Sequence, residues 1–220
     1  MSTIKDKNLA TIGQQEVDWA ARQMKVLEEI KTEFSSSKPL NGLNIGACMH
    51  VTKETANLML TLKAAGANVA LCASNPLSTK DSVAAYLSEN DIEVHAVHGV
   101  SNEDFFKHLN SVLDTNPDIT MDDGADLVTL LLTDRADIPI MGSMEETTTG
   151  VIRLKSMEKN NKLRFPVVAV NDSETKHLFD NRFGTGQSAM DGVVRATDLL
   201  IAGLDVVVIG FGDCGKGAVS

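Results

Sequence analysis

The dominant feature of the chain is a repeated alternation of short apolar runs with helical patterns. The helical patterns include 53–67 and 79–90, and Gly66 is suited to end the first of them as a helix C-cap. Repeated strand–helix–strand units predict an α/β fold, a doubly wound and mostly parallel sheet with helices on both faces. The apolar runs that we expect to form its strands are residues 43–48, 68–73, 92–97, 118–123, 138–143 and 165–170.

The two ends of the chain add further elements to this pattern. Residues 16–34 carry apolar side chains at helical spacing and predict one leading helix, which is followed by a linker at 35–42. Toward the other end, helical patterns at 173–181 and 187–203 precede an apolar run at 204–210. We expect this last run to be a seventh strand that opens a second sheet.

Three glycines follow the predicted seventh strand. Gly210, Gly212 and Gly215 form the pattern G-x-G-x-x-G, in which the glycines permit a tight turn, close approach of a pyrophosphate and close packing of the following helix. The free N–H groups of that helix then face the phosphates. The pattern predicts a Rossmann-like substrate domain over 1–185 and the start of a second, dinucleotide-binding Rossmann domain over 186–220.

Two other interpretations of the glycine turn stay open. From Gly210 to Lys216 the residues also match G-x-x-x-x-G-K, but Gly217 stands where a P-loop has the Ser or Thr that holds magnesium. A turn that binds no ligand is the second alternative. The acidic residue that contacts the ribose of NAD is expected about 20 positions further on, so residues 1–220 leave NAD and NADP undistinguished.

Composition excludes several classes of partner. The net charge of −10 argues against a nucleic acid or an anionic membrane, which both need a basic surface. The first twenty residues have no apolar signal-peptide core, and no apolar run approaches the length of about 20 residues that spans a membrane. The three cysteines are far apart and lack zinc-ligand spacing. We expect a cytoplasmic protein with reduced thiols and no metal site.

Polar residues gather after most of the predicted strands. Ligands of open parallel sheets bind beyond the carboxyl ends of the strands, so these residues are candidates for one site. Each group also has a structural explanation, as a helix cap, a turn or an acidic first helical turn. Together they offer carboxylates, hydroxyls, an imidazole and a lysine, which suit a polyhydroxylated ligand and proton transfer. They are His50, Thr52, Ser74, Asn75, Asp122, Asp123, Asp126, Glu145, Glu146, Thr147 to Thr149, Asn171, Lys176, Asp180 and Asn181.

Lys176 and Asp180 illustrate how open the choice is. Their i, i+4 spacing places them on one helix face, where a surface ion pair contributes under about 1 kcal/mol. The functional alternative is a lysine held beside a carboxylate for proton transfer. Spacing alone favours the surface pair.

The ordered motifs resemble those of the S-adenosyl-L-homocysteine hydrolases. The resemblance covers residues 19–220 and is carried by "MHVTKETANL", "DDGADL", "EETTTGV", "NDSETKHLFDN", "DGVVRATDLLIAG" and "GFGDCGKG". The family implies reversible hydrolysis of S-adenosyl-L-homocysteine to adenosine and L-homocysteine in the methyl cycle. It also implies a tightly bound NAD that oxidises the 3′-hydroxyl to a ketone, which makes the 4′ C–H acidic and allows homocysteine to leave. A homotetramer is implied as well.

The resemblance also implies roles for individual residues. Asp123 would transfer protons, His50 would assist at the leaving group and Thr52 would contact the nucleoside. Glu146 would bind the ribose hydroxyls, and Lys176 with Asp180 would hold the ribose and handle the 3′ proton, which reverses the preference stated above. The cofactor would be bound by Thr147, Thr148, Thr149 and Asn181, and by the glycine turn with Gly212, Asp213, Cys214, Gly215, Lys216 and Gly217.

The chain departs from the family in two respects. Thr185 stands where many members have cysteine, a variant similar to archaeal and some bacterial members, of which some prefer the inosyl substrate. The resemblance therefore implies either the adenosyl or the inosyl compound as substrate. Family members also continue well past residue 220, through most of the NAD domain. We expect the 220-residue chain to be inactive alone, and an inactive substrate-domain homologue is the alternative.

Overall fold

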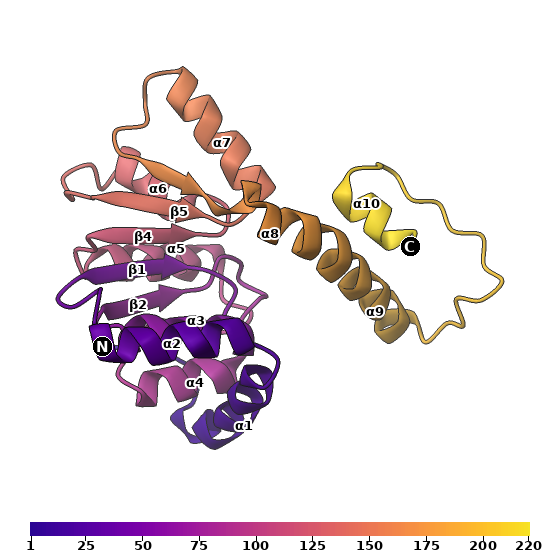
Figure 1. The fold of residues 1–220 in the computed structure, drawn as a ribbon, viewed down its shortest axis with the longest axis horizontal. Helices are drawn as coiled ribbons and strands as arrows, with labels where there is room; N and C mark the ends of the chain where they lie inside the picture. Colours follow the sequence, from indigo (N-terminus) through magenta and orange to yellow (C-terminus); the bar gives the residue numbers. More distant parts are fainter. The chain divides into compact units, whose positions relative to one another are not determined.

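The computed structural model describes residues 1–220, and the chain divides into two compact units, Met1–Val168 and Ala169–Ser220 (Figure 1). We describe each unit by itself. The predicted functional division between residues 185 and 186 remains a prediction.

The first unit is built on a six-stranded sheet with the strand order β3-β2-β1-β4-β5-β6. Its pairings β1–β2, β2–β3, β1–β4 and β4–β5 are parallel, which confirms the predicted α/β fold. The order reverses between β1 and β4, and this reversal is the switch point at which doubly wound sheets bind ligands. The strands are Asn44–Cys48 (β1), Asn68–Cys72 (β2), Glu93–His95 (β3), Ile119–Asp122 (β4), Gly142–Glu145 (β5) and Val167–Ala169 (β6).

Helices cover both faces of the sheet, and successive strand residues contribute to opposite faces. Ile45 and Ala47 of β1 belong to one core cluster with residues of α1, α3 and α4. Cys48 belongs to the second cluster, with residues of α5, α6 and α7. Burial on both faces explains why the strands are apolar runs in the sequence. The helices are Ala10–Ala21 (α1), Lys25–Ser37 (α2), Lys53–Ala64 (α3), Asp81–Glu89 (α4), Asn102–Leu113 (α5), Asp126–Leu132 (α6) and Thr148–Lys159 (α7), with a short 3-10 turn at Lys7–Leu9 (η1).

Two predicted elements of the first unit need correction. The single helix expected over 16–34 is wrong, because the chain breaks after α1 and restarts as α2, with Met24 in a non-helical conformation. The break lets α1 pack on α3 and α4 while α2 packs on α3. The fifth strand starts at Gly142 rather than at residue 138, since Pro139 in the predicted run has no N–H for a sheet. Gly66 follows α3 with φ of +99°, as its predicted capping role requires.

The second unit is mainly one long helical segment. It comprises Val170–Asp172 (η2), Glu174–Lys176 (α8), a π-helix at His177–Gly184 (η3) and Thr185–Thr197 (α9), followed after a coil by Asp213–Ala218 (α10). The predicted helices at 173–181 and 187–203 fall largely within it, but the π-helix was not predicted. No helix of the chain has the length and apolar character that crossing a membrane requires.

The seventh strand predicted at 204–210 does not form in this structure. Its residues pair with no neighbouring strand, and Val207 and Ile209 are 84% and 97% exposed. A β-strand depends on a partner for its N–H and C=O groups, which the apolar pattern cannot supply. The helix expected after the glycines does form, as α10.

Candidate active site at the carboxyl ends of the strands

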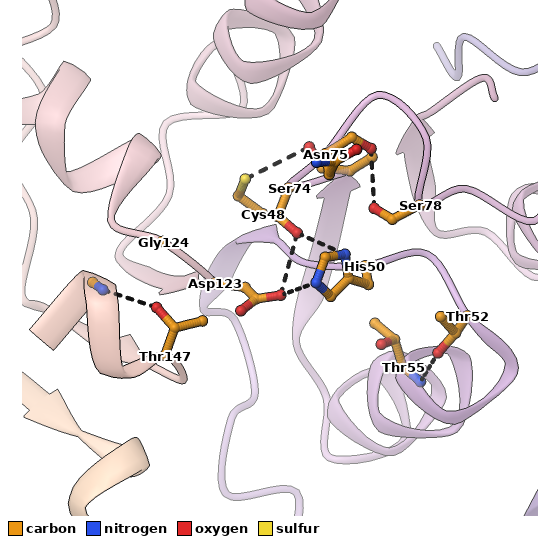
Figure 2. A network of polar contacts seen from close by, with 12 residues as sticks. Cys48, His50, Thr52, Thr55, Ser74, Asn75, Ser78, Asp123, Gly124 and Thr147 are labelled. Atoms are coloured by element: carbon orange, nitrogen blue, oxygen red, sulfur yellow. Dashed lines mark hydrogen bonds and ion pairs between the residues drawn. The ribbon is translucent and has the colours of Figure 1, made fainter. Parts of the chain in front are cut away.

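His50 and Asp123 meet at the switch point of the sheet. His50 follows β1 and Asp123 follows β4, and these two strands are neighbours on which Cys48 pairs with Asp122. The Nε2 atom of His50 lies 2.9 Å from Oδ2 of Asp123 (Figure 2). The imidazole is half exposed, whereas Asp123 is largely buried. The site therefore presents an imidazole to the solvent with a carboxylate behind it.

Ser74, which follows β2, completes this group. Its hydroxyl lies 3.2 Å from Nδ1 of His50 and donates to Oδ2 of Asp123 at 3.2 Å (Figure 2). The carboxyl ends of three adjacent strands thus place three polar side chains in contact. Ser74 is among the strand-end residues of the sequence, but its contact with both partners could be found only from the sheet order.

The carboxylate of Asp123 changes the protonation of His50. The hydrogen bond from His50 to Asp123 raises the pKa of the imidazole above its ordinary value, while partial burial opposes the rise. A histidine with this partner keeps its proton to a higher pH than a free imidazole does and can release it to a bound group. The arrangement is suited to acid–base chemistry.

Asp123 lies at the start of a strained turn. Gly124 and Ala125 both have positive φ, +126° and +61°, and Ala125 is a residue for which that conformation is unfavourable. The buried side-chain oxygens of Asp122 accept hydrogen bonds from the N–H groups of Leu127 and Val128, at 3.1 and 2.8 Å, and so stabilise the start of α6 after the turn. The turn is therefore stabilised by Asp122, a buried residue that does not face the site.

The predicted binding residues Thr52 and Thr147 also cap helices. The hydroxyl of Thr52 accepts from the N–H of Thr55 at the start of α3, and that of Thr147 accepts from the N–H of Gly150 at the start of α7. Thr149 donates to the Thr147 hydroxyl at 3.4 Å. The structure therefore bears out the capping explanation for Thr147, and it shows that Thr52 caps a helix as well. The predicted contacts of Thr52, Thr147, Thr148 and Thr149 with a nucleoside or a cofactor remain predictions.

A cavity of about 620 Å³ opens beside Glu146. Its walls combine apolar side chains of α2 and α3, such as Leu27 and Leu58, with polar ones. The polar residues are Gln23, Lys25, Glu54, Thr55 and Glu146. This volume and the combination of apolar walls with polar groups are typical of small-molecule sites. Sequence analysis did not single out Glu54 and Thr55, although both stand within the "MHVTKETANL" motif.

The second unit gathers its own set of predicted residues around Lys176. The Lys176 ammonium donates to Oδ1 of Asn181 at 2.8 Å and to Oδ1 of Asn171 at 3.1 Å, and it lies 3.3 Å from Oδ2 of Asp180. Asn181 also donates to Asn171, at 3.2 Å. Lys176 directly precedes the π-helix and contacts Asn181, five residues further on, and π-helical turns are frequently found at functional sites. Asn171, a strand-end residue without an assigned role, is thus the common acceptor of this group.

The glycine turn of the second unit fits a dinucleotide in part. Gly212 precedes α10, which contains Asp213, Cys214, Gly215, Lys216 and Gly217. A Cβ atom at Gly215 would lie 2.3 Å from the carbonyl oxygen of Gly210, so close packing at this position requires glycine. Gly210 has φ of +104°, as a tight turn needs. The preceding strand, by contrast, is not formed.

The chain matches known proteins over its whole length. The family model described as S-adenosyl-L-homocysteine hydrolase matches residues 1–139 and 134–207. The S-inosyl-L-homocysteine hydrolase of Methanococcus maripaludis is 54% identical over 222 residues, which cover 100% of this chain and 54% of the relative. The adenosylhomocysteinases of Pyrococcus abyssi and Aquifex aeolicus are both 52% identical, over 97% of this chain and 51% and 52% of their own length.

The chain therefore spans about half the length of these relatives. The motifs that carry the resemblance in the sequence lie within the matched residues. On the family model and on relatives that are more than half identical, the chain belongs to the S-adenosyl-L-homocysteine hydrolase family.

Proposed function

We propose that the chain provides the substrate-binding part of an enzyme that reversibly hydrolyses S-adenosyl-L-homocysteine to adenosine and L-homocysteine, using NAD. The single observation that carries the proposal is the His50–Asp123 pair at the switch point of a chain of this family. A doubly wound sheet binds its ligand at this position. Acid–base groups there can therefore exchange protons with a bound substrate.

In this proposal the residues of the first unit bind the substrate and move protons. Asp123 is a proton-transfer residue, and His50 assists at the sulfur leaving group with the proton that its carboxylate partner stabilises. Glu146 binds ribose hydroxyls, and Thr52 contacts the nucleoside. The position of Glu146 on the wall of the cavity with Glu54 and Thr55 supports binding of a nucleoside there.

The residues of the second unit serve the same reaction. Lys176 and Asp180 hold the ribose and handle the proton of the 3′-hydroxyl, and Asn171 orients Lys176 through its side-chain oxygen. Three oxygen partners around the Lys176 ammonium keep its position defined. When bound, NAD would supply the oxidant that takes a hydride from the 3′ carbon, which gives the 3′-ketone, and its reduced form would return the hydride at the end of the reaction. Thr147, Thr148, Thr149, Asn181 and residues 212–217 would hold the NAD.

Two further parts of the proposal concern the setting of the enzyme. We propose a homo-oligomer, in agreement with the tetramer that the family implies, and a cytoplasmic location in agreement with thiols that form no disulfide. Neither nucleic acid nor membrane is a proposed partner, in view of the charge of −10. Light scattering of the purified chain measures its assembly directly.

A second substrate is favoured by one observation. The relative from Methanococcus maripaludis is named an S-inosyl-L-homocysteine hydrolase and is 54% identical to this chain. The inosyl compound differs at the base, so the two candidates place different donors and acceptors against the cavity wall that contains Glu54 and Thr55. Hydrolysis of either thioether uses the same proton-transfer groups.

The test is a thermal-shift titration of the chain with adenosine and with inosine. We expect one nucleoside to raise the melting temperature, and Asp123→Asn to weaken that rise. Lys107→Gln, a change on the exposed face of α5, is the matched control and should bind as the unmodified chain does. Stabilisation by neither nucleoside, in the chain and in a longer form that includes the rest of the family length, would contradict the proposal. Nucleoside binding without turnover would support the alternative that the 220-residue chain is an inactive substrate-domain homologue.

A further inference from the structure

Glu145 is a completely buried acid at the end of β5, between the two loops that carry Asp123 and Glu146. One of its oxygens, Oε1, accepts three hydrogen bonds. The donors are the N–H of Gly124 at 2.9 Å, the N–H of Thr147 at 2.9 Å and the hydroxyl of Thr147 at 2.7 Å. One carboxylate oxygen therefore joins the residue after Asp123 to the residue after Glu146.

The bond to Gly124 acts on the strained turn described above. Gly124 and Ala125 both have positive φ, and an alanine holds that conformation only when its surroundings impose it. The N–H of Asp123 donates to the carbonyl of Cys48 at 3.0 Å, so the residue is held from β1 on one side. Glu145 supplies the next contact along the chain. The carbonyl of Gly124 accepts a further hydrogen bond from Arg153, so both polar groups of the Gly124 backbone are bonded.

The carboxylate of Glu145 has little freedom to move. A Cβ atom added to Gly150 of α7 would lie 2.2 Å from Cδ of Glu145, so the backbone of α7 packs directly against the carboxylate. Its second oxygen, Oε2, is buried and makes no hydrogen bond. A buried carboxylate with one unpaired oxygen is unfavourable for stability and is retained where it serves another purpose. The three bonds to the loops indicate that purpose.

We propose that Glu145 is a positioning residue, whose buried carboxylate fixes Asp123 relative to Glu146 and thereby maintains the contact between Asp123 and His50. The roles of Asp123 and Glu146 in binding and proton transfer rest on the proposed function. The effect on the His50–Asp123 contact does not, because that contact is a property of the chain alone.

Two single substitutions separate this role from a simple effect of charge. Glu145→Gln removes the negative charge but keeps an oxygen at the position of Oε1. Glu145→Asp keeps the charge but withdraws the carboxylate by one methylene, out of reach of Gly124. If Glu145 acted on His50 through its charge, the Gln variant would change the titration of His50 and the Asp variant would not. A positioning role predicts the opposite order.

The measurement is the titration of the five histidines of the chain by NMR, with the His50 signal assigned from a His50→Gln variant. In Glu145→Asp we expect the pKa of His50 to fall toward its ordinary value, and in Glu145→Gln we expect it to stay near that of the unmodified chain. Leu113→Ala leaves a cavity where the end of α5 packs against the core. It is the control for lost stability and should leave the His50 titration unchanged. If Glu145→Asp does not fold, Gly150→Ala displaces the carboxylate without changing its charge and is titrated instead.

Nucleoside binding gives an independent readout. We expect Glu145→Asp to bind the nucleoside about tenfold more weakly, since the two loops would lose a shared hydrogen-bond acceptor, and Glu145→Gln to bind nearly normally. An unchanged His50 titration in a folded Glu145→Asp variant would overturn the inference. A changed titration in a chain for which no form binds nucleoside would support the positioning role and contradict the proposed function.

Discussion

Asp122 and Glu145 are register partners on β4 and β5, and both side chains are completely buried. Burial is the largest cause that raises the pKa of Asp122, to about 7, and the nearby Glu145 charge adds to it, while the N–H groups of Val128 and Leu127 act in the opposite direction. Because the folded state raises the pKa of Asp122, the free energy of unfolding must depend on pH.

The pH dependence of unfolding should contain a contribution from Asp122. The folded protein binds a proton at this carboxyl up to about pH 7, whereas the unfolded chain releases it near pH 4, its ordinary range. Between these values the folded state holds more protons, so the free energy of unfolding falls as pH rises, by up to a few kcal/mol. We expect the difference between the original chain and Asp122→Asn to shrink from pH 5 to pH 8 in urea unfolding. A difference that is constant over this range would contradict the raised pKa.

The pair of His50 and Asp123 makes stability depend on pH in the same direction, through attraction between the two side chains rather than through burial. Since Asp123 raises the pKa of the folded imidazole, the pair contributes stability below the ordinary histidine pKa, and this contribution disappears as pH rises through the folded value. Asp123→Asn should lower the pKa of His50 in an NMR titration. If Asp123 has the proposed proton-transfer role, the same change should reduce hydrolysis by about 100-fold or more in a form of the protein that turns over.

The control for this titration is His108 in α5, whose pKa is lowered mainly by burial. Its titration should be the same in Asp123→Asn and in the original chain. An unchanged His50 pKa in the variant would show that Asp123 is not the partner of the imidazole in solution.

Gly150→Ala should destabilise the protein even though it places the best helix former within α7. Helix propensity alone predicts a gain of about 1 kcal/mol, but the new Cβ atom would lie 2.2 Å from the Glu145 carboxylate, which is itself held by three hydrogen bonds. Overpacking at such a site costs about 1–3 kcal/mol, so we expect a net loss in thermal unfolding.

Gly192→Ala in α9 is the matched substitution. Nothing lies within 4 Å of the Cβ position of Gly192, so an alanine there adds its higher helix propensity and contacts no other atom. The helical circular dichroism signal should therefore rise or stay unchanged. A stabilised Gly150→Ala variant would show that the carboxylate moves aside more easily than the contacts indicate.

Asn171→Ala should loosen the π-helix of the second unit. The substitution removes the oxygen that accepts from both Lys176 and Asn181, and a lost buried acceptor costs about 1–3 kcal/mol. Amide hydrogen exchange should accelerate over His177–Gly184 and remain unchanged in α5. Equal exchange of the π-helix in both proteins would mean that Asn171 does not support it.

Thiol labelling should distinguish Cys214 from the other two cysteines. Cys48 and Cys72 are completely buried, and the hydrogen bond with Cys72 and burial raise the pKa of Cys48, so both should react only on unfolding. The exposed Cys214 should react at once, and Cys214→Ser should abolish the fast phase. If residues 212–217 bind NAD as proposed, added NAD should slow the labelling of Cys214. Rapid labelling of two thiols in the native chain would contradict the burial of the pair.

Much of the first unit could be predicted from the sequence because its strands are buried on both faces. Such strands appear as apolar runs whatever their neighbours are, and β1, β2 and β4 lie within the predicted ranges. The polar residues that follow them could be assigned to one rim for the same reason. The chain order alone then placed His50 and Asp123 after strands of one sheet.

The tertiary structure decided what local patterns do not encode. The contact of His50 with Asp123 and Ser74 depends on the strand order, which brings β1 between β2 and β4. The grouping of Asn171, Lys176 and Asn181 depends on how η2, α8 and the π-helix follow one another, and an analysis based on the 3.6-residue period does not detect such changes of helix type.

The same distinction explains the corrections and the role proposed for Glu145. Residues 204–210 have the composition of a strand but no partner, because pairing is a property of two segments and not of one. Glu145 appears in the sequence as one of two adjacent acids, and only the fold turns it inward, toward Gly124 and Thr147, while Glu146 lines the cavity. Residue order determined which groups stand at the strand ends, and packing of the strands and loops determined which of them meet.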